Sequence, residues 1–210
     1  MSVTMLPSST YEVRQNEIAM VSRRKGIQRR ETLFTQGLNP CIGVLLWDDN
    51  WVVLGHLHDS TQGSFEASYA AVLMKMRTDS GGLSVISGGI LYHKNLHTHL
   101  IDHRDTLRNY LRDNGVVVQT DTVSSNDDPE NPALRVAVSR SGKYATPHIK
   151  TTMQAPGKPL AVTRAGPYAQ IITPRLIGLA VPAITIITGQ DQAETYDHGS
   201  FTALARRYGL

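Results

Sequence analysis

Two short apolar runs joined by an acidic turn constrain this chain more than any other feature of its sequence. Residues 41 to 47 and 51 to 54 are apolar enough to form buried strands, and Asp48-Asp49-Asn50 separates them. Apolar runs of this length around a polar turn predict a β-hairpin. The first strand begins at Cys41 and the second leads towards His56, so the hairpin brings both residues to its open end.

Cys41 is the only cysteine among 210 residues, so it cannot form a disulfide within the chain. It is either an inert core thiol or a reactive one, because free cysteines are among the most buried residues. A cysteine nucleophile needs an imidazole within hydrogen-bond reach, and His56 at the end of the return strand meets that need. The residues alone leave both interpretations open.

The rest of the chain alternates strand and helix patterns, with the final 60 residues giving few periodic signals. We expect strands at 18–21, 32–35, 83–86, 116–122, 135–139 and 184–187, helices at 64–76 and 102–114, a short helix at 200–208, and a turn at Gly88-Gly89. This order predicts an α/β or α+β fold, in which a mixed β-sheet or β-sandwich core is flanked by helices. We expect a flexible leader over 1–12, one domain over 13–150, and a C-terminal extension over 151–210 that packs on the same domain.

A series of short motifs between Glu17 and Val118 resembles the chemoreceptor glutamine deamidase family, CheD. They are Gly37-Leu38-Asn39-Pro40-Cys41, Leu54-Gly55-His56, and an apolar stretch that ends in Gly88-Gly89, followed by a helical segment. The family has Gly-Ser where this chain has Asn39-Pro40. Proline has no N–H, so one backbone donor near the thiol is lost.

The resemblance implies a Cys–His–Thr catalytic set. Cys41 matches the nucleophile and Thr35, six residues before it, matches the threonine. The CheD spacing without a gap selects His58. The Gly-His context and the spacing of the architecturally related cytotoxic necrotizing factor deamidases select His56, which we prefer. Gly88, Gly89, Asn39 and His58 are expected to border the substrate.

The implied activity is deamidation of a protein glutamine to glutamate, with release of ammonia and without a metal or organic cofactor. The implied partner is a protein that carries a reactive glutamine, either a chemoreceptor or a host regulatory protein attacked by a bacterial virulence effector. A catalytically silent binding module with the same fold is the alternative from a different functional class.

Composition is typical of a globular protein, with 40% hydrophobic residues and a formal charge of +3. The basic residues between 23 and 30 lack interleaved aromatic side chains, which favours a solvated turn over a nucleic-acid surface. The longest apolar stretch, 176–188, is too short to span a membrane. We expect a reducing compartment, either the bacterial cytoplasm or a host cell reached without a cleavable signal peptide.

Two other groups of residues carry weaker signals. His93, His97, His99 and His103 include pairs at helical metal-binding spacing, but they lack a nearby cysteine, and a polar loop and helix entry is the simpler interpretation. His58-Asp59-Ser60 contains the residue types of a hydrolase triad. Adjacent residues cannot form such a triad among themselves, and no Gly-x-Ser-x-Gly turn is present.

Overall fold

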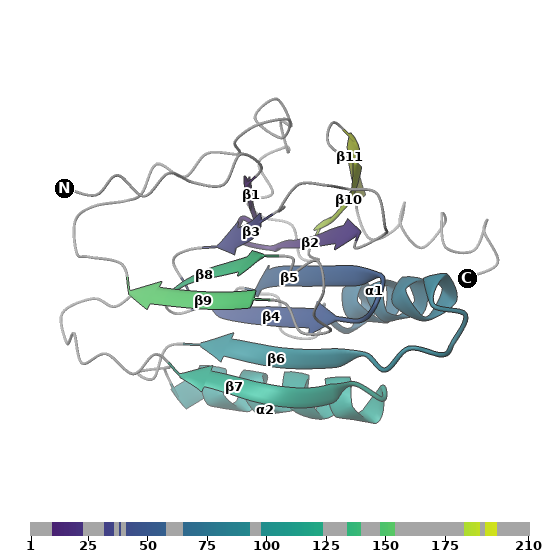
Figure 1. The fold of residues 1–210 in the computed structure, drawn as a ribbon. Coiled ribbons are helices and arrows are strands. Elements are labelled where there is room, and N and C mark those ends of the chain that lie inside the picture. The colour runs from purple at the N-terminus through teal and green to yellow at the C-terminus, as the bar shows by residue number, and fades with distance from the viewer. Residues whose placement is uncertain are drawn as a thin grey trace, which may run out of the picture.

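The computed structural model of the chain describes residues 10–22, 32–35, 38, 41–57, 65–92, 98–123, 134–139, 148–153, 183–189 and 192–196. Within these residues lie eleven strands and two helices (Figure 1). The helices are α1 (Phe65–Asp79) and α2 (Thr98–Asp113). The strands are β1 (Thr10–Glu12), β2 (Glu17–Ser22), β3 (Thr32–Thr35), β4 (Ile42–Trp47), β5 (Trp51–Leu57), β6 (Ser87–Tyr92), β7 (Val117–Val123), β8 (Leu134–Ser139), β9 (His148–Met153), β10 (Ala183–Gly189) and β11 (Gln192–Tyr196).

The described strands form two mixed sheets. The larger has the order β11-β10-β2-β5-β4-β6-β7, and the smaller has the order β1-β3-β8-β9. In the larger sheet β10 with β2, and β6 with β7, are parallel, and the other neighbours are antiparallel. The helix α2 connects β6 to β7 and runs along β7 (Figure 1). The expected α+β class with a mixed sheet is therefore confirmed.

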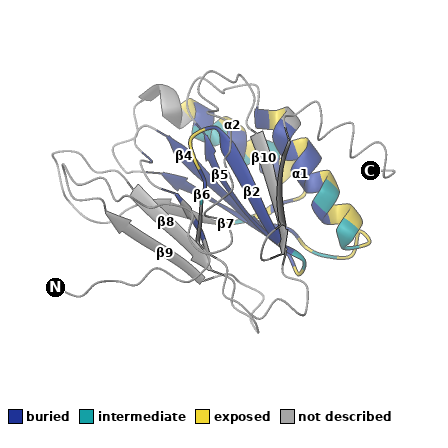
Figure 2. Cartoon of the chain, turned by 90° about the horizontal axis from the view of Figure 1, so that it is seen from above, coloured by how far each residue is buried: buried dark blue, intermediate teal, exposed yellow. Residues whose placement is uncertain are grey.

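Both helices cover the same face of the larger sheet, with their buried sides turned towards it (Figure 2). The sequence of α1 places five large apolar residues at helical spacing, and all five are buried: Phe65, Tyr69, Val72, Leu73 and Met76. We call the resulting cluster the helix-side core. It includes Ile18, Met20, Ile42, Val44, Leu46, Val53, Phe65, Tyr69, Val72, Leu73, Met76, Ile90, Leu107 and Leu111.

The opposite face of the larger sheet packs against β3 of the smaller one. Successive residues of a strand point to opposite faces, so the neighbours of the helix-side residues on β2, β4 and β5 form a second cluster. We call it the site-side core. It contains Val13, Ala19, Val21, Leu33, Leu38, Cys41, Leu45, Trp47, Val52, Leu54 and Leu91.

The predicted hairpin is present as β4 and β5, and its turn is anchored to the end of α1. Asp48 Oδ1 accepts hydrogen bonds from the backbone N–H groups of Asn50 (2.8 Å) and Trp51 (2.7 Å). The indole N–H of Trp51 donates to Asp79 Oδ2 at 2.7 Å, and Lys75 Nζ lies 3.0 Å from the same oxygen. The hairpin therefore has a fixed closed end, which holds its open end in register.

Three sequence expectations needed correction in this region. Residues 83–86 are not a strand, and Gly88-Gly89 is not a turn, because both glycines lie inside β6 and pair with Leu46 and Leu45. A Cβ at Gly88 would lie 2.9 Å from Val116 Cγ1 and 3.0 Å from Leu46 Cδ2, so this glycine serves close packing. The helix expected at 102–114 begins earlier, at Thr98, whereas its end at Gly115 is confirmed by the positive φ of 71° there.

Segments outside the expected domain of residues 13–150 contribute to both sheets. The strand β1 lies inside the range predicted as a flexible leader, but it pairs in parallel with β3 in the smaller sheet. The strand β10 belongs to the predicted C-terminal extension and pairs in parallel with β2 in the larger sheet. The short helix expected at 200–208 lies outside the described residues.

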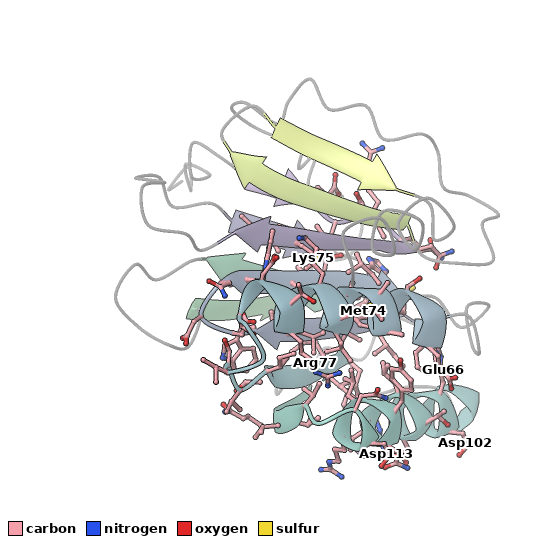
Figure 3. All side chains as sticks on the ribbon, turned by 90° about the vertical axis from the view of Figure 1, so that its right-hand side faces the viewer. Glu66, Met74, Lys75, Arg77, Asp102 and Asp113 are labelled. Carbon is pink, nitrogen blue, oxygen red and sulfur yellow. The ribbon has the colours of Figure 1, made fainter. Side chains whose placement is uncertain are left out.

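The outer side of α1 is polar or exposed. Figure 3 labels Glu66, Met74 and Arg77 there, and these three side chains are exposed. In the part of the chain that the structure describes, no helix is both long and apolar enough to cross a membrane.

Candidate functional site

Two of the three predicted catalytic residues meet between the sheets. Thr35 ends β3 of the smaller sheet, and His56 lies near the end of β5 in the larger one. Thr35 Oγ1 lies 2.8 Å from His56 Nδ1, and both side chains are buried, with exposed fractions of 0% and 5%. Thr35 was assigned to the site only by the resemblance to the CheD family, through its spacing from Cys41. Its hydrogen bond to His56 is independent of that spacing.

The hydrogen bonds of Thr35 assign the tautomer of His56. Thr35 Oγ1 also lies 2.8 Å from the carbonyl oxygen of Val13, which can only accept. The hydroxyl has one proton, and it is donated to Val13. The oxygen of Thr35 must then accept the Nδ1–H of His56, which leaves the lone pair of the neutral ring on Nε2. The arrangement makes His56 Nε2 the proton acceptor.

The sheet register places Cys41 beside this histidine. His56 lies directly opposite Gly43 of β4, and Cys41 immediately precedes β4 on the same face as Gly43. Cys41 and His56 are therefore diagonal neighbours across two adjacent strands, a relation within reach of long side chains. Gly43 adds no side chain between them, and a Cβ there would lie 3.0 Å from Leu38 Cδ1 and 3.2 Å from Leu91 Cβ.

The thiol is less accessible than the sequence suggested. A reactive cysteine is expected to be exposed, whereas the Cys41 residue is 4% exposed and belongs to the site-side core. Leu33 of β3 belongs to the same buried cluster as Cys41, and Thr35 of the same strand contacts His56. A partner would have to reach Cys41 with a thin side chain.

Residues 13–17 form a turn around His56 that sequence reasoning missed. Asn16 has a φ of 60°, and its N–H donates to the carbonyl oxygen of His56 at 2.7 Å. The Glu17 N–H donates to the Arg14 carbonyl at 3.1 Å, and the Arg14 N–H donates to Glu17 Oε2 at 2.9 Å. Asparagine tolerates this left-handed conformation better than most residues. An Asn-Glu pair directly before an apolar run is the signal that could have located the turn.

Glu17 is a fully buried carboxylate next to the predicted base. It is 0% exposed, and it lies directly opposite His56 in the antiparallel pair of β2 and β5. Residues opposite each other in such a pair share a face, with Cβ atoms about 4.5–5.5 Å apart. One row across the sheet thus contains Glu17, His56, Gly43 and Leu91.

Two other predicted site residues, Gly88 and Gly89, are not brought to this place. Gly88 and Gly89 pair four to five residues further along β4 than Cys41, a displacement of roughly 13–17 Å. Asn39 and His58 lie outside the described residues, as do His93 and His97 of the histidine group. His103 is buried on α2 with its ring centroid 5.4 Å from that of Phe65.

No protein-family model matches the chain, and no protein of known function matches it significantly in sequence.

Proposed function

We propose that the chain is a protein-glutamine deamidase of the CheD-like type, with Cys41 as nucleophile, His56 as base and Thr35 as the residue that orients the base. The observation that carries this proposal is the chain of contacts from Val13 through Thr35 to His56. It assigns the proton-accepting nitrogen to Nε2 of a histidine diagonal to the only cysteine. A third group that fixes the tautomer of the base is a general feature of activated nucleophiles.

The proposed reaction uses only this chain, the substrate and water. His56 Nε2 takes the thiol proton, and the Cys41 sulfur attacks the carboxamide carbon of a glutamine. The protonated imidazole gives its proton to the departing nitrogen, so ammonia leaves and a thioester remains. Water, deprotonated by His56, then breaks the C–S bond, which yields glutamate and restores the thiol. The Cys41 N–H is a candidate donor to the tetrahedral oxyanion.

A silent binding module is the second candidate, and the burial of Cys41 is the observation that favours it. A thiol that is 4% exposed in a packed interface between two sheets meets the description of an inert core residue. The hydrogen bond between buried Thr35 and His56 favours the enzyme, because it fixes the tautomer that a base beside Cys41 would need.

The burial of the Cys41 thiol limits which proteins could be substrates. We propose a folded protein that presents a glutamine on a protruding loop or terminus, since a bulky surface cannot approach the covered thiol. A chemoreceptor and a host regulatory protein both satisfy this description.

The experiment is a comparison of the parent protein with Cys41→Ala on bacterial and host-cell lysates. Ammonia release is measured together with glutamine-to-glutamate conversion, a mass increase of about one dalton per site, by peptide mass spectrometry. We expect a small number of glutamines to convert with the parent only. The same glutamines converting equally with both proteins, or none converting with the parent, would contradict the proposal.

A further inference from the structure

We propose that Glu17 is a positioning residue for His56, whose negative charge stabilises the protonated imidazole. This inference rests on the proposed function. The charge of Glu17 would make a thiolate–imidazolium pair the favoured resting state of Cys41 and His56. No sequence motif singled Glu17 out. The residue is identified by its place in the sheet and its burial.

The first step is the location of the charge. Glu17 is 0% exposed, begins β2 and lies directly opposite His56, on the face that also contains Cys41. Its Oε2 accepts the Arg14 N–H at 2.9 Å. This hydrogen bond fixes the orientation of the Glu17 side chain at the start of β2.

The second step is the effect of that charge on the imidazole. Burial in an apolar environment disfavours protonated histidine, whereas an opposite charge within about 4–6 Å favours it. Thr35 contributes no charge, because its hydroxyl is a neutral group that accepts the Nδ1–H and donates to the carbonyl oxygen of Val13. Glu17 is therefore the group that offsets the burial of a charged His56.

Among the described residues, three other ionisable side chains belong to the segments around His56. Cys41, which immediately precedes β4, is the proposed proton donor. Glu12, on β1, alternates with Val13 of the site-side core, so it lies on the outward face of the smaller sheet. Arg14, in the turn, is exposed. Among the described residues of β2 to β5, Glu17 is the carboxylate in register with His56.

The experiment measures the His56 titration by NMR in a protein that has no thiol. All proteins carry Cys41→Ala, and the His56 ring signal is assigned from its loss in His56→Gln. Glu17→Gln removes the charge but keeps an oxygen that accepts the Arg14 N–H. We expect the titration midpoint to fall by about one pH unit, a tenfold loss of proton affinity. The matched control is Glu66→Gln, an exposed carboxylate on the far side of α1, which should leave the midpoint unchanged.

Midpoints that agree within about 0.2 unit with and without the Glu17→Gln substitution would overturn the inference. If the Glu17→Gln variant does not fold, a second measurement tests the inference. In Cys41→Ala alone, the midpoint should lie above the ordinary histidine value of about 6.5 despite burial, and a value below it would contradict the role of Glu17. Neither measurement involves turnover, so the inference and the deamidase proposal can fail separately.

Discussion

The two faces of β5 pack against cores of different composition. Gly55 and His56 are adjacent, but Gly55 faces the helices and His56 faces β3. The helix-side core is mostly apolar, but it includes the hydroxyl group of Tyr69, which has no hydrogen-bond partner among the described residues, and that of Tyr92. His103 is also buried on this side, against Phe65. The other face buries Thr35, His56, Glu17 and Cys41 together. Burying an ionisable group costs free energy unless it is paired, and on that face Glu17 and His56 lie directly opposite each other.

The largest expected effect is on activity and comes from the polar face. Cys41→Ala should reduce glutamine deamidation by at least about 1,000-fold, because nucleophile and base act as one unit. His56→Ala should match it, whereas His58→Ala should have a much smaller effect. Deamidation is measured by ammonia release. The free energy of unfolding, from urea denaturation, should change by less than about 1.5 kcal/mol in Cys41→Ala. If Cys41→Ala or His56→Ala lost activity only because the protein unfolded, the face towards β3 would not have a separate role in activity.

On the helix side the expected effect is on stability. Phe65 is fully buried and contacts the rings of His103 and Tyr110, with centroids 5.4 and 5.7 Å away. Phe65→Ala should lower the free energy of unfolding by about 3–5 kcal/mol, because it removes buried area and leaves a cavity. Met74→Ala, on the exposed side of the same helix, should change it by less than about 0.5 kcal/mol. An equal loss of unfolding free energy in Phe65→Ala and Met74→Ala would show that α1 does not pack as described.

A smaller effect on stability is expected from the close approach of Gly55 and Tyr69 on the helix side. A Cβ at this position would clash with the Tyr69 hydroxyl oxygen but would lie 3.4 Å from the ring carbon Cζ. Gly55→Ala should cost about 1–3 kcal/mol of unfolding free energy, and less than about 1 kcal/mol in a Tyr69→Phe background. Tyr69→Phe alone should be neutral or stabilising, since the hydroxyl is buried without a partner among the described residues. Additive costs in the double variant would refute this contact.

Burial also raises the pKa of the Tyr69 hydroxyl above its ordinary value, with desolvation as the cause. A group with a raised pKa in the folded state that carries charge only when deprotonated favours folding less as pH rises past its unfolded value of about 10. The stability advantage of Tyr69→Phe should therefore grow in alkaline solution. A pH-independent difference between the two proteins would argue against a buried hydroxyl.

Local patterns predicted much of the fold, since the hairpin, β3, α1 and the end of α2 each depend on nearby residues. Gly88 and Gly89 were wrongly predicted as a turn because glycine usually marks turns, whereas at Gly88 neighbouring side chains fill the space that a Cβ would need. The parallel pairing of β2 with β10 joins residues far apart in the chain and leaves no local signal. Glu17 was missed for a similar reason, because its role depends on a partner strand.

The smallest expected effect concerns Thr35, which acts through His56. Thr35→Ser keeps the hydroxyl and should retain most activity, whereas Thr35→Val removes the contacts to Val13 and His56 and should lower kcat about tenfold. Ammonia release by the two variants, measured side by side, separates orientation from packing. Full activity in Thr35→Val would remove Thr35 from the site.

The most direct measurement of the central claim needs no knowledge of the substrate, because the chain has a single cysteine. It is the rate of Cys41 alkylation by iodoacetamide in the folded protein as a function of pH, in the parent and in His56→Ala. A thiolate–imidazolium pair predicts steady alkylation of the parent near pH 6, where an ordinary thiol with a pKa of about 8.5 is almost wholly protonated. His56→Ala should lose that low-pH reaction. A parent whose rate rises only near pH 8.5, as in His56→Ala, or which is alkylated only after denaturation, would contradict the account.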